Sequence, residues 1–292
     1  MNEYVFFFPS VFPEIIVFQC LFLAKSLHSA KIQSTKFHSS LASSSPTSLL
    51  SSASALPQIK PENVNFKIGI IGCGNIGKEI VKALLMNGFK PSQVLISTRR
   101  PASLEKITNL GVQCFCDNAW AAQSGPDLLI LCCLPAQFHQ VVGSELRGKI
   151  PARTLLCSTL LGVPEKKLES ALQCRNCIAT VVNVNQIRSL EVLKNVGPES
   201  IPREALVRLA SPLCEDGSVK FLENWFRTLT KVFAIDPDHG TEKCIRLILE
   251  HAFGSSDFSI AQPFTRSLAK KARLGEEISL EFISKYVAGL AF

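Results

Sequence analysis

The stretch FKIGIIGCGNIG, residues 66–77, decides the fold of this chain. Its first half, residues 66–71, is a short apolar run of the kind that forms a buried strand, and a helical pattern follows the stretch. Between strand and helix, Gly72, Gly74 and Gly77 have the GxGxxG spacing. A glycine loop in this setting is typical of a dinucleotide-binding domain.

Each glycine has its own physical role in such a loop. Gly72 permits the tight turn, Gly74 leaves room for a pyrophosphate, and Gly77 lets the helix pack closely on the sheet. The backbone N–H groups of Asn75 and Ile76 then face the phosphates at the positive end of the helix. The alternative is a tight strand-to-helix turn that binds nothing.

Short apolar runs alternate with helical patterns beyond this loop. Strands are predicted at 66–71, 94–97, 112–115, 127–133, 154–158 and 177–183, and helices at about 75–87, 101–110 and 118–123. The run at 127–133 is continuously apolar, as in a strand that is covered on both faces. The alternation predicts an α/β fold, a Rossmann-type doubly wound parallel sheet.

The composition changes at both ends of this region. After Pro202 only helical periodicity remains, which predicts a smaller, mainly α C-terminal domain. We therefore expect a disordered or targeting segment over 1–65, the Rossmann domain over 66–200 and the helical domain over 201–292. Ordered structure should begin at Phe66.

The N-terminal segment itself has two parts. Residues 1–24 are apolar, but Pro9, Pro13 and Glu14 interrupt them, so no integral membrane span is expected. Residues 25–60 are rich in serine and contain no Asp or Glu, which fits an organelle transit peptide or a plain disordered tail equally well. The expected compartment is accordingly the cytoplasm or the mitochondrion.

The second half of a dinucleotide fingerprint lies about 20 residues beyond the glycines, where an acidic residue binds the ribose 2′-hydroxyl of NAD. Here the predicted strand ends in Ser97, Thr98, Arg99 and Arg100, with no carboxylate. Two hydroxyls and two guanidiniums can bind a 2′-phosphate, so NADP is preferred over NAD. The alternative for the two arginines is a solvated surface pair.

Three further positions belong to the predicted site. The segment CCLP, 132–135, ends the fourth strand, where an open α/β sheet exposes its ligand crevice. Asn118 can either cap its helix or reach the cofactor. Asn183, at the end of the sixth strand, lies toward the expected nicotinamide end, with a plain polar strand end as its alternative.

Composition narrows the classes of partner. The net charge of +7 could indicate an acidic partner, but no nucleic-acid-binding motif accompanies it, so no nucleic-acid binding is expected. The 11 cysteines are scattered, and the CxxC at Cys174 and Cys177 lacks further ligands at metal spacing. Free thiols in a reducing compartment and no metal are therefore expected.

The residues from about Lys67 to Asn183 resemble the pyrroline-5-carboxylate reductase family of proline biosynthesis. The resemblance is carried by IGIIGCGNIG at 68–77, DN at 117–118, DLLILCCLP at 127–135 and STLLGV at 158–163. With ISTRRP at 96–101, it is closest to the NADP-dependent oxidoreductase domain-containing branch. The resemblance implies that NADP contacts Ile71, Gly72, Cys73, Gly74, Asn75, Ile76, Ser97, Thr98, Arg99, Arg100, Asn118, Cys132, Cys133, Leu134 and Pro135. It also implies a homodimer formed through the C-terminal helical domain.

The chain departs from the family pattern in its second half. Leu134 replaces the family's lysine before proline, and Asn185 stands where the family has a proline. Residues 184–292 contain neither the GSGPA-like segment nor the SPGGAT-like loop that holds the substrate carboxylate in the family. Catalytic residues therefore remain unknown. Two functions stay open: an NADPH-dependent reductase of a small imine or carbonyl substrate, or a catalytically inactive NADP-binding sensor or scaffold.

Overall fold

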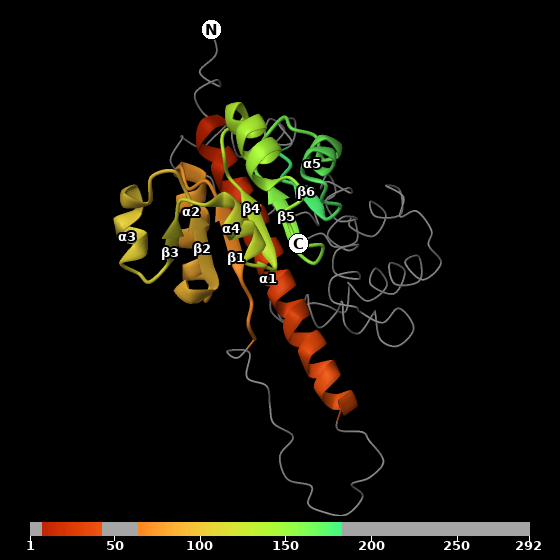
Figure 1. The fold of residues 1–292 in the computed structure, drawn as a ribbon. Helices are drawn as coiled ribbons and strands as arrows, with labels where there is room; N and C mark the ends of the chain where they lie inside the picture. Colours follow the sequence, from red (N-terminus) through yellow and green to blue (C-terminus); the bar gives the residue numbers. More distant parts are fainter. Residues whose placement is uncertain (1–7, 43–63, 183–292) are drawn as a thin grey trace, which may run out of the picture.

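A six-stranded parallel sheet forms the centre of the part of the chain that the structure describes (Figure 1). The structure is a computed structural model that describes residues 8–42 and 64–182. The strands are β1 (Ile68–Ile71), β2 (Val94–Ser97), β3 (Gln113–Phe115), β4 (Leu128–Leu131), β5 (Leu155–Ser158) and β6 (Cys177–Ala179). Their order, β3-β2-β1-β4-β5-β6, is that of a Rossmann fold, which confirms the predicted fold class for this part of the chain.

Helices cover both faces of the sheet. Alternate residues of each strand point to opposite faces, and because both sets are apolar, both faces must be buried. Ile70 and Ile130 belong to one hydrophobic cluster, whereas Ile71 and Leu131 belong to the other. The helices are α1 (Phe8–Ala42), α2 (Asn75–Met86), α3 (Glu105–Thr108), α4 (Asn118–Gln123), a π-helix (His139–Leu146) and α5 (Glu165–Leu172). The first cluster includes α1 and α2, and the second includes α4, the π-helix and α5.

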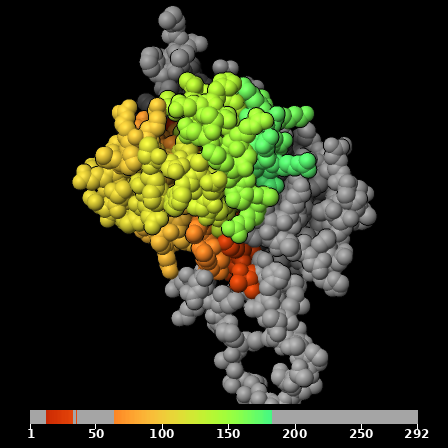
Figure 2. Space-filling view, viewed as in Figure 1, coloured from red at the N-terminus to blue at the C-terminus, as the bar shows by residue number. Residues whose placement is uncertain are grey.

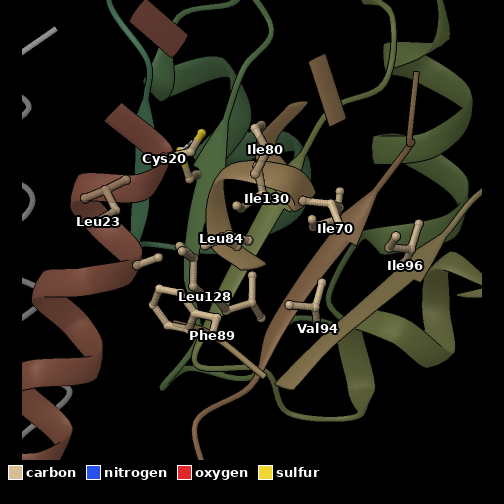
Figure 3. Close-up of a cluster of buried hydrophobic side chains, with 14 of the residues drawn as sticks. Cys20, Leu23, Ile70, Ile80, Leu84, Phe89, Val94, Ile96, Leu128 and Ile130 are labelled. Carbon is tan, nitrogen blue, oxygen red and sulfur yellow. Dashed lines mark hydrogen bonds between the residues drawn. The ribbon is translucent and has the colours of Figure 1, made fainter. Parts of the chain in front are cut away.

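The helix α1 is where the structure differs most from the prediction. Residues 8–42 form a helix that packs beside α2 along one face of the sheet, so ordered structure does not begin at Phe66 (Figure 1). In Figure 3, Cys20 and Leu23 of α1 lie in the same cluster as Leu128 and Ile130 of β4. Figure 2 shows only a small part of α1, in red, at the lower edge of the domain.

Three specific contacts hold α1 on the sheet. The Gln19 amide donates to the carbonyl of Val181 at 2.7 Å and accepts from its N–H at 2.9 Å. Lys31 forms an ion pair with Asp127 at 2.6 Å, and the other oxygen of Asp127 accepts from the backbone of Lys67. The expectation of disorder is therefore wrong for residues 8–42, because this segment supplies part of the core. The alternative of a targeting segment stays a prediction.

The composition of α1 explains why it was missed. Its apolar residues are spread around the helix, and polar residues such as Ser26 and Ser29 lie on its buried face. The amphipathic pattern of a surface helix is therefore absent from the sequence. The window Pro13–Ile32 is long and apolar enough to cross a membrane by length and composition, contrary to the expectation from its interruptions. Both the core helix of a soluble protein and a signal sequence near the N-terminus pass the same test, and 67% of the window is buried here.

Other predicted elements are mostly present and shorter. The predicted strand at 127–133 is confined to Leu128–Leu131, and the predicted helix at 101–110 is a 3₁₀ turn followed by the short α3. The helices at 139–146 and 165–172 were not predicted. The predicted C-terminal helical domain at 201–292, and the dimer expected through it, lie outside the described residues.

The replacement Gln19→Ala should lower the free energy of unfolding by about 1–3 kcal/mol, because it removes two part-buried hydrogen bonds between α1 and the backbone of Val181. Urea denaturation followed by circular dichroism measures this change. The control Glu14→Ala alters an exposed residue of the same helix and should change stability by less than about 0.5 kcal/mol. Equal, small effects of both would mean that α1 does not unfold with the sheet.

Candidate functional site

The carboxyl ends of the strands lie in one row, and the predicted site residues follow them. Ile71 pairs in register with Ser97 on one side and with Leu131 on the other. The segments that begin at Gly72, Thr98 and Cys132 therefore leave the sheet side by side. This edge, between β1 and β4, is where connections change direction and where open α/β sheets bind their ligands.

Gly72 sits in a turn that only glycine can make without strain. Its φ is +82°, and a Cβ atom there would lie 3.0 Å from the backbone of Cys132 and Cys133. The N–H of Gly72 donates to the carbonyl of Ser97 at 2.8 Å, and the N–H of Cys132 donates to the carbonyl of Ile71 at 2.7 Å. The turn is thus fixed against the ends of both neighbouring strands.

Gly74 and Gly77 differ in what surrounds them. A Cβ on Gly77 would lie 2.9 Å from the carbonyl oxygen of Gly72, so this glycine allows α2 to approach the turn. A Cβ on Gly74 would meet no atom of the described residues within 4 Å. Gly74 is the N-cap of α2, and neither a side-chain cap nor an acidic residue in the first turn occupies the positive end of the helix. Gly74 therefore faces open space beside free N–H groups, as a phosphate site requires.

The end of β2 combines a buried hydroxyl with two exposed cations. Ser97 is 1% exposed, and its Oγ donates to Oδ1 of Asn118 at 2.6 Å. Arg99 and Arg100 are exposed, and within the described part of the chain neither guanidinium forms an ion pair. Both positive charges are available to an anionic ligand.

Asn118 does not cap α4. The cap is Asp117, whose carboxylate accepts from the N–H of Trp120 at 2.8 Å. Asn118 is the first residue of the helix, and its amide instead bridges Ser97 and Glu145, donating to Oε2 of Glu145 at 2.5 Å. The capping alternative is therefore wrong, because the preceding aspartate already occupies that position.

Glu145 is a residue that the sequence analysis missed. It lies on the π-helix His139–Leu146 and is half-buried. No spacing rule connects a glutamate at this position with an asparagine 27 residues earlier. Only the packing of the π-helix against α4, on the same face of the sheet, brings the two side chains together.

The segment 132–135 forms a neutral, partly apolar wall of the site. Burial raises the pKa of Cys133 to about 11 and raises that of Cys132 as well. Burial likewise raises the pKa of Cys73 to about 12, so these thiols are protonated near neutral pH and are poor nucleophiles. Leu134 is 65% exposed at the mouth of the edge.

The arrangement can bind an elongated anion, but no described residue forms an acid–base pair or a nucleophilic dyad beside it. The described cysteines are free thiols, and within residues 8–42 and 64–182 no three His, Cys, Asp or Glu side chains gather to hold a metal. Asn183 and the segment 184–292 lie outside the described residues. The groups that would face a substrate from that side are therefore not placed.

Comparison with known proteins agrees with this geometry. Residues 67–162 match the family model described as "NADP oxidoreductase coenzyme F420-dependent". The mouse protein named NADP-dependent oxidoreductase domain-containing protein 1 is 40% identical over 112 residues, which are 38% of this chain and 30% of that protein. A pyrroline-5-carboxylate reductase from Escherichia coli is 31% identical over 146 residues, 48% of this chain and 51% of that protein.

The chain thus spans between about a third and a half of the length of these relatives. A solved pyrroline-5-carboxylate reductase from Coxiella burnetii covers 76% of this chain, which in turn covers 85% of it, with 18% identity and a TM-score of 0.35. A structural similarity of this size supports no inference about function. Residues 67–162 accordingly match the NADP oxidoreductase family model, and the same part of the chain is similar in sequence to the pyrroline-5-carboxylate reductases.

Proposed function

We propose that this chain binds NADP(H) along the carboxyl edge of its sheet and reduces a small imine or carbonyl compound. The observation that carries the proposal is the open space at Gly74 beside the uncapped start of α2. A pyrophosphate fits there, because its charge meets free N–H groups and the positive end of the helix. Arg99 and Arg100, exposed at the end of β2, favour a 2′-phosphate over a 2′-hydroxyl.

The substrate class is taken from the relatives, several of which are named pyrroline-5-carboxylate reductases. Bound NADPH would supply a hydride to the electrophilic carbon, and a proton from water would complete the reduction. The residues of this chain need only hold the nicotinamide against the substrate, since hydride transfer requires no nucleophile from the protein. The protonated thiols of Cys73, Cys132 and Cys133 fit this role, because they line the site without acting as nucleophiles.

The replacement Gly74→Ala should weaken NADPH binding by more than about tenfold, because its methyl group occupies the space proposed for the pyrophosphate. The melting temperature should stay nearly unchanged, since no atom of residues 8–42 or 64–182 lies within 4 Å of the added carbon. Gly77→Ala is the matched control: its Cβ would clash with the carbonyl of Gly72 and should lower stability and affinity together. Unchanged NADPH affinity in Gly74→Ala, measured by titration calorimetry, would contradict the proposed site.

The double replacement Arg99→Gln/Arg100→Gln should reduce NADPH affinity by about tenfold or more and leave NADH affinity within about twofold, because only NADPH carries the 2′-phosphate. Fluorescence titration with both cofactors measures the two dissociation constants. Arg147→Gln removes an exposed arginine from the end of the π-helix and should change neither. A parallel loss for both cofactors would refute the assigned role of the two arginines.

Activity is tested by following NADPH absorbance with pyrroline-5-carboxylate and a panel of small cyclic imines. We expect oxidation of NADPH with at least one member of the panel and none without substrate. Stoichiometric NADPH binding without oxidation by any imine or carbonyl would contradict the reductase proposal. That result would instead favour the non-catalytic NADP-binding protein.

A further inference from the structure

A hydrogen-bonded relay crosses the proposed cofactor site between three separate elements. It runs from Ser97 at the end of β2, through Asn118 at the start of α4, to Glu145 on the π-helix. The two distances are 2.6 and 2.5 Å, and all three residues are buried or half-buried. The end of β2 is expected to face the adenosine ribose. The relay therefore connects this end of β2 with a carboxylate that lies 48 residues further along the chain, on the π-helix.

The direction of the relay follows from the chemistry of its end groups. An ionised carboxylate can only accept hydrogen bonds, so Glu145 must receive a hydrogen from Nδ2 of Asn118. The amide oxygen is then turned toward Ser97, whose hydroxyl donates to it. Asn118 retains one amide hydrogen and one oxygen lone pair for a ligand. A ribose hydroxyl can use both, because it donates and accepts, whereas a phosphate dianion can use only the hydrogen.

The negative charge of Glu145 also favours a ribose 2′-hydroxyl over a 2′-phosphate. The end of β2 lacks the acidic residue that NAD-binding sites place there. Glu145 brings a negative charge close to this position, since only the side chain of Asn118 lies between its carboxylate and Ser97. Within a half-buried site such a charge repels a 2′-phosphate more strongly than it would in water. Arg99 and Arg100 on the neighbouring loop attract the same phosphate.

We propose that Glu145 is a specificity-determining, positioning residue: through Asn118 it favours a ribose 2′-hydroxyl and so limits the preference for NADPH that Arg99 and Arg100 provide. This inference rests on the proposed dinucleotide site. In the usual dinucleotide-binding fingerprint, an acidic residue at the end of β2 recognises the ribose 2′-hydroxyl. Here a residue of the π-helix would have that role. A purely structural tie between the π-helix and α4 is the competing explanation.

The replacement Glu145→Gln tests the role of the charge. Glutamine keeps an oxygen that can accept from Asn118, so the relay can persist without its negative charge. The ratio of the dissociation constants for NADH and NADPH should rise by about tenfold, mainly through tighter NADPH binding. At high ionic strength the ratios of the variant and the wild type should become more similar, because salt screens the repulsion between Glu145 and the 2′-phosphate.

The matched control is Glu169→Gln. It removes the same charge from a half-buried glutamate on α5, beside Cys174, at the opposite edge of the sheet, and should leave the ratio unchanged. A structural tie predicts instead that Glu145→Gln changes the affinities for NADH and NADPH equally. That outcome would overturn the inference, as would a similar rise of the ratio in Glu169→Gln.

A second measurement needs no variant. In the wild-type protein, 2′-deoxy-NADH should bind several-fold more weakly than NADH, because it cannot bond to Asn118 through a 2′-hydroxyl. Equal binding of the two would overturn the inference even if Glu145→Gln fails to fold. If the wild type binds neither NADH nor NADPH, the proposed function itself is refuted. If it binds them but the ratio and the deoxy analogue show no effect, only the role of Glu145 is refuted.

Discussion

The close contact between the backbone of Gly72 and the backbone at Cys132–Cys133 is the constraint on which the rest of the site depends. It requires a residue without a side chain and with positive φ at the end of β1. Once the turn has this shape, α2 starts directly above the edge of the sheet, and Gly77 can pack against the carbonyl of Gly72. The free N–H groups of the helix then point toward the space beside Gly74. A bulkier turn would move the helix away and close that space.

The long helix α1 covers part of one face of the same sheet. A parallel sheet needs cover on both faces, and α2 and α3, which follow β1 and β2, leave β4 and β5 to be covered on that side by another element. Here the N-terminal helix provides the cover, with Cys20 only 3.8 Å from the Cys157 sulfur of β5. The paired hydrogen bonds of Gln19 with Val181 extend the contact to the chain just beyond β6. The helix α1 is therefore part of the domain that contains the glycine loop.

The electrostatics of the site are a balance between charges from different elements. Two exposed arginines follow β2, the start of α2 adds a partial positive charge, and Glu145 opposes them from the π-helix. The two thiols that follow β4 contribute no charge near neutral pH because burial raises the pKa of Cys132 and Cys133. Binding and discrimination can therefore be altered separately, since the residues proposed for each lie on separate segments.

The sequence by itself determined the parallel sheet and the glycine turn, and it predicted where the candidate site lies on the sheet. These features depend on local patterns: apolar runs of strand length, glycines at fixed spacing, and the rule that ligands bind at the carboxyl ends of parallel strands. The tertiary structure alone decided the place of α1, whose apolar residues surround the helix and give no one-sided pattern. It alone decided that Asp117, not Asn118, caps α4 and that Glu145 meets Asn118. The physical reason is that a hydrogen bond between two helices depends on how both pack on the sheet, and no local pattern in either segment records that packing.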